Sequence, residues 1–427
     1  MQNSAQMQKC NITSQWARKE ASRCLFCFDA PCKKDCPAEI NVPLFIRLIR
    51  WGDIVGAKKV IKGSNILGGI CAYLCPSEEL CQKNCNCGQL GEPIQISDLQ
   101  CYACNNADFK YEIKSEPTNK KVAVIGAGPA GLSCAMKLKS FGHSVDIYEK
   151  EDCLGGTVAR EIPPERIPQE VLQRDIEELN LTNNKVRTYF NMKVDKAFFE
   201  KLIDTYDAVF ISTGLDKERE MDLINKSYDS VYYSSDFLTR VKKGLINKVD
   251  GTFITIGGGN TAIDCARTAL ELGAERSIIA YRRSKKEMPA YEREFIEASV
   301  EGIEFMFLVS PKDIRRKGKG IEIEFCRNKL VPGKGKRKSF TVVDGTEFTL
   351  SVDMAVFAVG MDADVFNELI GEENIKINPE NLQIGNTKVF SGGDCVNENK
   401  TVVQAVADGK KAALGIDKFL KEGMLNA

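Results

Sequence analysis

Closely spaced cysteines dominate the amino-terminal quarter of the sequence. Twelve of the 17 cysteines lie between Cys10 and Cys104. Most of them form two runs, Cys24-x2-Cys27-x4-Cys32-x3-Cys36 and Cys71-x3-Cys75-x4-Cys81-x3-Cys85. Thiolates two to four residues apart can converge on one polynuclear centre, and iron–sulfur clusters need about four such ligands. The spacing therefore predicts two [4Fe–4S] clusters in this part of the chain.

Structural zinc is the main alternative for these cysteines. Zinc sites favour two CxxC pairs around a tetrahedral ion, whereas a proline follows Cys36 and another follows Cys75, as is typical of ferredoxin-like sets. Spacing alone groups Cys71 with Cys75, Cys81 and Cys85. The cysteines that cannot all be ligands of two clusters are Cys10, Cys71, Cys87, Cys101 and Cys104.

A glycine-rich turn follows the short apolar run VAVI. It reads Gly126-Ala-Gly128-Pro-Ala-Gly131 and precedes a helical segment and a strand that ends in Glu149. Such glycines let the backbone approach a pyrophosphate at a helix N-terminus, and the acid can accept hydrogen bonds from a ribose hydroxyl. Gly155-Gly156 offers a second close backbone approach, and Asp394 in VFSGGD could hold the ribityl hydroxyls of a flavin. These motifs predict an FAD site.

A second turn of the same kind lies at residues 257–262, GGGNTA. Here the next strand ends in Arg282 and Arg283, which favours the 2′-phosphate of NADP(H) over NAD(H), although a solvated strand end remains the alternative. Two dinucleotide sites in one chain predict hydride transfer between nicotinamide and flavin, without a catalytic side chain. The segment after Gly156 contains no cysteine pair, which argues against disulfide reduction.

The elements that carry these motifs predict an α/β protein with an added helical domain. Apolar residues recur at helical spacing in 42–61, and the polar segment 110–121 is typical of a linker. Strand–helix–strand units follow at 121–150 and 252–283, as in parallel sheets. We predict a helical iron–sulfur domain, then two Rossmann-like domains with the NAD(P) domain inserted into the FAD domain. The predicted boundaries are 1–118 (clusters), 119–245 (FAD, first part), 246–360 (NAD(P)H) and 361–427 (FAD, second part).

Charge and composition narrow the possible partners. Lys+Arg and Asp+Glu number 59 each, so no net charge attracts the chain to nucleic acid or to a membrane surface. We expect neither partner, and the lack of a long apolar run or signal-like N-terminus predicts a cytoplasmic location. His143, the only histidine, follows a glycine before an alternating strand. A surface turn position, without a catalytic role, is expected there.

Together these motifs resemble a known family of electron-transfer subunits. The chain resembles the small subunit of bacterial glutamate synthase and, more closely, the amino-terminal half of dihydropyrimidine dehydrogenase and the separate bacterial subunit matching that half. The resemblance extends from about Ala21 to the C-terminus. The segments that carry it are ASRCLFCFDAPCKKDCP, GGICAYLCPSEELCQKNC, VIGAGPAGLS, GGTVAREIPPERIP, IGGGNTAIDCA, YRRSKKEMPA, VFSGGD and KTVVQAVADGK.

The resemblance implies specific residues for each cofactor. Cluster 1 would use Cys24, Cys27, Cys32 and Cys85. Cluster 2 would use Cys36, Cys75, Cys81 and, unusually, Gln100, with Cys101 or Cys104 as a possible substitute for Gln100 and Cys71 as a non-ligand. The FAD set is Gly126, Gly128, Pro129, Ala130, Gly131, Glu149, Lys150, Gly155, Gly156, Arg166, Gly214, Gly393, Asp394, Thr401, Val402 and Val403. The NADP set is Gly257, Gly258, Gly259, Asn260, Thr261, Arg282, Arg283 and Gly360.

The resemblance also implies a function. It predicts an electron-input subunit that oxidises NADPH or NADH through FAD and passes electrons through [4Fe–4S] clusters to a larger, FMN-containing partner subunit. Pyrimidine reduction and glutamate synthesis are the two reactions of such partners. The alternatives are the flavin subunit of a ferredoxin-linked NAD(P) transhydrogenase and a redox-sensing flavoprotein without turnover.

Overall fold

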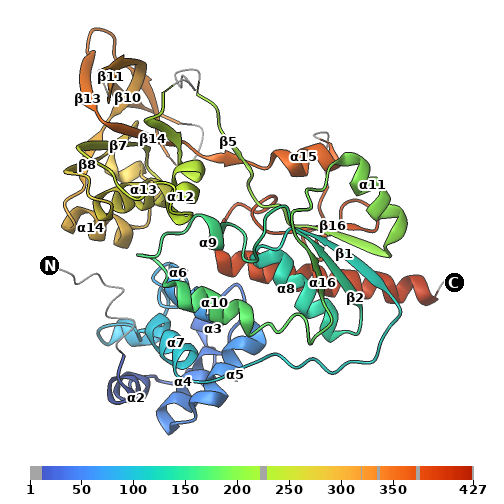
Figure 1. Ribbon diagram of the computed structural model, residues 1–427. Coiled ribbons are helices and arrows are strands. Elements are labelled where there is room, and N and C mark those ends of the chain that lie inside the picture. Colours follow the sequence, from blue (N-terminus) through green and yellow to red (C-terminus); the bar gives the residue numbers. More distant parts are fainter. Residues whose placement is uncertain (1–11, 222–227, 319, 334–336, 372–375, 426–427) are drawn as a thin grey trace. The chain divides into compact units, whose positions relative to one another are not determined.

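The computed structural model describes residues 12–221, 228–318, 320–333, 337–371 and 376–425 (Figure 1), so Cys10 lies outside the described residues. The chain divides into two compact units. Unit 1 comprises Met1–Ala159, Pro164–Asp216 and Ala363–Ala427, and unit 2 comprises Arg160–Pro163 and Lys217–Asp362. Within the described ranges, no helix has both the length and the apolar composition of a membrane span.

The amino-terminal part of unit 1 is helical. Its elements are α2 (Ser14–Ser22), α3 (Pro31–Lys34), α4 (Val42–Trp51), α5 (Ile54–Ser64), α6 (Gly68–Leu74), the 3-10 turn η1 (Asn86–Gln89) and α7 (Ile96–Asn105). The predicted helical segment 42–61 is divided at Gly52, whose φ of +86° ends α4. Asp53 then starts α5, because its Oδ1 accepts a hydrogen bond from Gly56 N at 2.8 Å. The buried faces of these helices form one core around Phe45 and Leu99.

The rest of unit 1 is built on a five-stranded parallel sheet with the order β16-β4-β1-β2-β3. The strands are β16 (Val389–Ser391), β4 (Ala208–Ile211), β1 (Lys121–Ile125), β2 (Ser144–Tyr148) and β3 (Arg187–Tyr189). Its helices are α8 (Pro129–Ser140), α9 (Thr157–Arg160, which crosses into unit 2), α10 (Gln169–Glu177), α11 (Lys196–Thr205), α15 (Asp364–Ile370) and α16 (Val402–Leu425). The carboxyl-terminal chain therefore returns to complete the sheet, since β16 pairs with β4.

Helices α8 and α16 pack closely against each other. A Cβ at Gly409 would lie 2.1 Å from Ala130 O, so only glycine permits this approach. The Ser133 hydroxyl donates to Val406 O at 2.7 Å across the same contact. This packing fixes the N-terminal end of α16 relative to the glycine-rich turn that precedes α8.

Buried charges join the helical part of unit 1 to α10. Lys58 and Lys62 on α5 are fully buried, and Lys58 pairs with Glu178. Lys62 Nζ lies 2.5 Å from Asp175 Oδ1 and 2.7 Å from Glu178 Oε2. Asp175 Oδ2 also accepts a hydrogen bond from Ile70 N, at 2.8 Å, in the first turn of α6. Two ammonium groups are thus balanced by two carboxylates, as buried charges require.

His143 does not occupy the predicted surface turn position, and that prediction was wrong. The side chain is buried, with Nδ1 2.6 Å from Thr118 Oγ1 and Nε2 3.1 Å from Asp417 Oδ1 on α16. Burial holds its pKa below the usual value. The histidine joins the segment that enters β1 to the carboxyl-terminal helix, which is a structural role.

Unit 2 contains a second five-stranded parallel sheet, with the order β6-β14-β7-β8-β9. The strands are β6 (Val231–Tyr233), β14 (Met354–Ala358), β7 (Thr252–Gly257), β8 (Arg276–Tyr281) and β9 (Glu304–Phe307). Its helical elements are α12 (Ser234–Lys242), α13 (Asn260–Glu271), η2 (Lys285–Glu287) and α14 (Glu292–Val300). An antiparallel sheet of β10 (Val309–Lys317), β11 (Gly320–Val331), β12 (Ser339–Val342) and β13 (Phe348–Val352) adjoins it, and β5 (Lys217–Glu218) pairs with β15 (Met361–Asp362).

The predicted α/β fold is confirmed, with a helical domain followed by two Rossmann-like sheets. The long segment of unit 2 starts at Lys217, whereas the inserted domain was predicted to start at 246. The difference has a clear cause: β6 pairs in parallel with β14, so residues before 246 already belong to the second sheet.

Candidate cofactor sites

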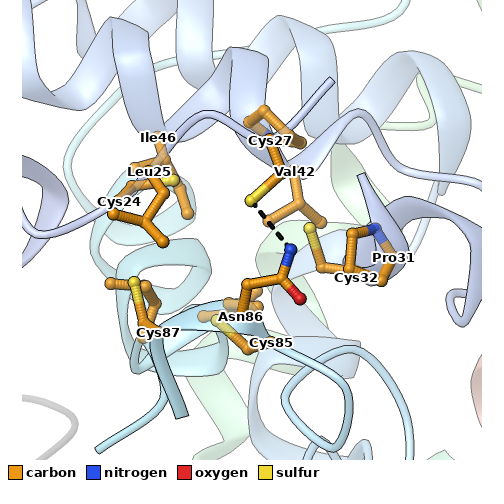
Figure 2. A pocket seen from close by; sticks show the side chains of 13 residues that line it. Cys24, Leu25, Cys27, Pro31, Cys32, Val42, Ile46, Cys85, Asn86 and Cys87 are labelled. Carbon is orange, nitrogen blue, oxygen red and sulfur yellow. Dashed lines mark hydrogen bonds between the residues drawn. The ribbon is translucent and has the colours of Figure 1, made fainter. Parts of the chain in front are cut away.

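The predicted cluster ligands line two separate cavities in the helical part of unit 1. The first cavity is shown in Figure 2. The cysteines in its wall are Cys24, Cys27, Cys32, Cys85 and a fifth thiol, Cys87. Most of the other lining side chains are apolar, including Leu25, Val42 and Ile46. The structure therefore brings together the four residues predicted for cluster 1.

The second cavity lies between α6, α7 and the segment that follows α3. Its polar wall includes Cys36, Cys71, Cys75, Cys81 and Gln100. Gln100 Nε2 donates to Gly68 O at 2.6 Å, which leaves Oε1 as the atom available to a metal. The two cysteine runs are thus divided between the cavities. Cys36 belongs to the first run but lines the second cavity, and Cys85 belongs to the second run but lines the first cavity. Cys101 and Cys104 are buried in α7 and are not among the residues that line either cavity.

The thiols in these cavities are desolvated. Burial raises the pKa of Cys24 to about 11 and that of Cys32 to about 12. The pKa of Cys75 is raised well above its usual value by a hydrogen bond with Cys71 and by burial. Metal binding offsets this cost, since a bound cation stabilises the thiolate. Among the described residues, no group of three or more His, Cys, Asp and Glu residues is placed to hold a single metal ion. This donor set fits a polynuclear iron–sulfur centre.

The first glycine-rich turn has contacts that only glycine allows. Gly126 has a φ of +97°, and a Cβ there would lie 2.5 Å from Ser212 O. A Cβ at Gly131 would lie 1.9 Å from Gly126 O. Pro129 and Ala130 form the first turn of α8, so the N-terminus of this helix faces the turn. This is the arrangement that binds a pyrophosphate.

A second segment lies directly against this turn. Gly155 N donates to Ala127 O at 2.9 Å, and a Cβ at Gly156 would lie 2.9 Å from Gly128 Cα. Glu149, at the end of β2, is buried and accepts hydrogen bonds from the backbone N–H of Ala127 (2.7 Å) and of Glu151 (2.9 Å). Glu149, which is predicted to accept hydrogen bonds from a ribose hydroxyl, therefore also holds the glycine-rich turn in place.

Three further predicted FAD residues lie outside the glycine-rich turns. Lys150 is exposed, and Arg166 is half-buried in the turns between α9 and α10. Gly214 follows β4 with a φ of +68°, and no atom lies within 4 Å of the position its Cβ would take. Of these residues, Lys150 and Gly214 follow the carboxyl ends of β2 and β4, where ligands of such sheets bind.

Asp394 is the most unusual polar residue of this site. The residue is partly buried, its buried Oδ1 has no hydrogen-bond partner among the described residues, and burial raises its pKa to about 6. The preceding Gly393 has a φ of +85°, and its N–H donates to Asp408 Oδ2 at 3.0 Å. A buried carboxylate oxygen without a partner fits a ligand hydroxyl that would donate to it. Asp408, which holds this turn, lies in the segment KTVVQAVADGK but was not among the predicted FAD residues.

The N-terminus of α16 lies beside the second cysteine cavity. Thr401 precedes the helix, and its Oγ1 accepts a hydrogen bond from Gln404 N at 3.3 Å. Val402 is partly buried against the helical core, and Val403 is 2% exposed and lines the second cavity. A helix N-terminus stabilises negative charge. Of these three predicted FAD residues, Val403 therefore shares a cavity wall with Cys36, Cys75 and Cys81.

The second glycine-rich turn lies in unit 2, between β7 and α13. Added Cβ atoms at Gly257 and Gly258 would lie 2.4 Å from Ala358 O and from the Tyr281 ring. At Gly259 nothing lies within 4 Å, so this glycine faces open space. Asn260 and Thr261 begin α13, and Asn260 Oδ1 accepts a hydrogen bond from Tyr291 N at 3.0 Å. The turn fits the close approach of a pyrophosphate.

Arg282 and Arg283 follow β8. Their guanidinium groups lie 5.3 and 5.5 Å from the centre of the Phe340 ring, and Arg283 Nε donates to Lys338 O at 2.7 Å. Partial burial and the neighbouring charge of Arg283 lower the pKa of Arg282. No carboxylate among the described residues pairs with Arg282. Gly360, with a φ of +109°, follows β14 and accepts a hydrogen bond from Arg219 N.

Comparison with known proteins agrees with this arrangement. Residues 1–111 match the family described as dihydropyrimidine dehydrogenase domain II, 4Fe-4S cluster. Residues 120–409 match the pyridine nucleotide-disulphide oxidoreductase family. The two matches cover the helical part that contains the cysteine cavities and the part that contains both glycine-rich turns.

Three curated relatives cover most of the chain. The NAD-dependent dihydropyrimidine dehydrogenase subunit PreT of Escherichia coli is 35% identical, over 96% of this chain and 96% of that protein. The glutamate synthase [NADPH] small chain of E. coli is 31% identical, over 95% and 92%. The NADP(+)-dependent formate dehydrogenase subunit beta of Moorella thermoacetica is 33% identical over 92% of this chain, which spans 60% of that subunit.

Solved structures show the same fold. FprA of Mycobacterium tuberculosis in complex with NADPH superimposes with a TM-score of 0.60 at 16% identity, over 73% of this chain and 86% of that one. The chain therefore belongs to the pyridine nucleotide-disulphide oxidoreductase family, among the iron–sulfur flavin oxidoreductase subunits related to dihydropyrimidine dehydrogenase and the small chain of glutamate synthase.

Proposed function

We propose that this chain is the electron-input subunit of an iron–sulfur flavoenzyme. It oxidises NADPH through FAD and passes the electrons through two [4Fe–4S] clusters to a larger catalytic subunit. One observation carries the proposal: Val403, in the first turn of α16, also lines the second cysteine cavity. A flavin at this helix N-terminus and a metal cluster among Cys36, Cys75, Cys81 and Gln100 would be neighbours.

The residues of the chain would bind and orient these groups. The proposed ligands are Cys24, Cys27, Cys32 and Cys85 for cluster 1, and Cys36, Cys75, Cys81 and Gln100 for cluster 2. The turn at 126–131 and Asp394 would hold FAD, and the turn at 257–262 with Arg282 and Arg283 would hold NADP(H). When bound, FAD accepts hydride and the clusters carry single electrons. The N-terminus of α16 would stabilise negative charge on the flavin ring.

NADP(H) is proposed over NAD(H) because Arg282 lacks a carboxylate partner among the described residues. A guanidinium group binds a phosphate in bidentate fashion, and the 2′-phosphate distinguishes the two cofactors. The relatives differ in the cofactor that their names give: NADPH for the glutamate synthase small chain, and NAD for the dihydropyrimidine dehydrogenase subunit PreT. The preference must therefore be measured on this chain.

The final reaction is proposed to take place on a larger, FMN-containing subunit, in the cytoplasm. The names of the relatives support such a partner, because each is a subunit or small chain of an enzyme. The proposed domains remain a cluster domain, an interrupted FAD domain and an inserted NAD(P)H domain.

The test is anaerobic purification of the full chain followed by measurement of iron, sulfide and flavin. We expect close to eight irons and one FAD per chain, and faster reduction of an artificial dye by NADPH than by NADH. Zinc in place of iron, or a chain without flavin, would overturn the proposal. Purification of the native complex, assayed with uracil, with 2-oxoglutarate plus glutamine, and with ferredoxin, would identify the reaction of the partner.

A further inference from the structure

Each cysteine cavity contains one asparagine outside the predicted ligand sets. In the first cavity, Asn86 Nδ2 lies 3.3 Å from Cys27 Sγ, and the amide extends between the cysteines of the wall (Figure 2). In the second cavity, Asn65 lines the wall and is fully buried. Within the part of the chain that the structure describes, its Nδ2 has no hydrogen-bond partner. A neutral N–H donor is therefore present at both sites.

The orientation of Asn65 is set by its surroundings. Its Oδ1 accepts a hydrogen bond from Leu67 N at 3.0 Å, and its own backbone N–H donates to Ile61 O at 2.9 Å at the end of α5. The amide oxygen is thus engaged in a hydrogen bond, whereas the amide NH2 group is not, among the described residues. Buried N–H groups nearly always have a partner in a folded protein. This unused donor points to an acceptor that occupies the cavity.

The other polar groups of the second cavity already have partners. Ser77 donates to Glu78, Ser97 donates to Gln82, and Gln100 Nε2 donates to Gly68 O. No charged side chain is among the residues that line either cavity. In the first cavity, Asn86 is the one lining residue other than cysteine with a polar side chain. The two asparagine amides are therefore the side-chain donors best placed to reach sulfur.

We propose that Asn65 and Asn86 are positioning residues that donate N–H···S hydrogen bonds within their own cavities and raise the reduction potential of the cluster there. The inference rests on the proposed function, because it requires a cluster in each cavity. Reduction adds one electron to a cluster, and a hydrogen-bond donor stabilises the added negative charge on thiolate or sulfide sulfur. No bond forms or breaks. Because each cavity has its own amide, the two potentials are set independently.

The test replaces each amide by a side chain of similar size without a donor. Asn86→Leu and Asn65→Leu are made in the full chain, purified anaerobically, and titrated with a reductant while the two cluster signals are followed by electron paramagnetic resonance. We expect each variant to lower the potential of one cluster only, and the two variants to affect different clusters. The expected change is about tenfold in the ratio of reduced to oxidised cluster, which is 59 mV for a one-electron couple.

The matched control is Asn106→Leu. Asn106 belongs to the same helical domain, donates to Tyr102 O and lines neither cavity, so both potentials should stay at their wild-type values. Unchanged potentials in both cavity variants would overturn the inference, and so would equal shifts of both clusters in a single variant.

A second pair of variants covers the case in which a leucine prevents the cluster from assembling in its cavity. Asn65→Ala and Asn86→Ala remove the donor and add neither bulk nor charge to the cavity. A lower potential of the corresponding cluster supports the inference. Loss of that cluster's iron in both variants of one asparagine would indicate a ligand and overturn it. Wild-type protein without cluster signals would instead refute the proposed function.

Discussion

Lys62 and Asp175 form an ion pair in which neither side chain is exposed to solvent. Lys62 Nζ lies 2.5 Å from Asp175 Oδ1, and Asp175 Oδ2 accepts a hydrogen bond from Ile70 N. The pair connects α5, α10 and the start of α6, the helix that carries Cys71 and leads to Cys75. Removal of one partner would leave an uncompensated buried charge.

We predict that Lys62→Met lowers the free energy of unfolding by about 3–5 kcal/mol, as for other broken buried pairs. The double variant Lys62→Met/Asp175→Leu should recover much of the lost stability, because no buried charge is then left without an opposite charge. Denaturant unfolding of the apoprotein measures both. The control is Lys83→Met, whose pair with Glu79 is exposed and worth at most about 1 kcal/mol. Equal effects of the two single variants would contradict the prediction.

The two cavities predict different outcomes for neighbouring cysteines. Cys85→Ser should remove one cluster and roughly half of the iron, because clusters use about four protein ligands and Cys85 is one of the four proposed for the first cavity. Cys87→Ser should keep both clusters, although Cys87 lines the same cavity. Iron and sulfide analysis with electron paramagnetic resonance distinguishes the variants. If Cys85→Ser retained its iron and Cys87→Ser lost iron, Cys87 and not Cys85 would be the ligand in the first cavity.

Asp394 predicts a trade-off between stability and flavin binding. Burial raises its pKa from 3.8 to about 6, so the folded apoprotein holds a proton that the unfolded chain has released. Stability should therefore fall as the pH rises from about 4 to about 6 and stay lower above this range. Asn at this position cannot ionise, so Asp394→Asn should stabilise the apoprotein at neutral pH by about 3 kcal/mol.

The same variant should bind FAD more weakly, because an amide oxygen is a poorer acceptor for ligand hydroxyl groups than a carboxylate. Unfolding measured across pH and FAD titration by fluorescence test the two halves separately. Asp146→Asn is the control, since the Asp146 carboxylate is already satisfied by Arg187 and Tyr206. Equal pH dependence of wild type and Asp394→Asn would contradict the assigned pKa.

Arg282 predicts the choice of nicotinamide cofactor. A hydrogen bond to a charged group contributes about 1.5–3 kcal/mol, so Arg282→Leu should raise the KM for NADPH by roughly 10–100-fold and leave the KM for NADH nearly unchanged. Steady-state reduction of a dye measures both. Arg276→Leu is the control, because Arg276 pairs with Glu304 on the neighbouring strand. A parallel rise in both KM values would show that Arg282 does not distinguish the cofactors.

The sequence by itself determined the kinds of chemistry and the local elements that carry them. Glycines at 126, 128 and 131 indicated a tight turn between strand and helix, and β1, α8 and β2 appear there because this pattern is local in the chain. Cysteine spacing indicated polynuclear metal chemistry for a similar reason, since neighbouring ligands can reach one centre. The family was also recognisable from these motifs.

Only the tertiary structure decided how distant residues are combined. Spacing alone grouped Cys85 with Cys75, and only the family resemblance implied otherwise. In the structure Cys85 lies with Cys24, and Cys36 lies with Cys75, because helix packing sets which segments meet. Asn65 had no motif, and Asn86 had only its position next to Cys85. The burial of His143 depends on Asp417, 274 residues away. Such contacts depend on long-range packing, which no local pattern of residues encodes.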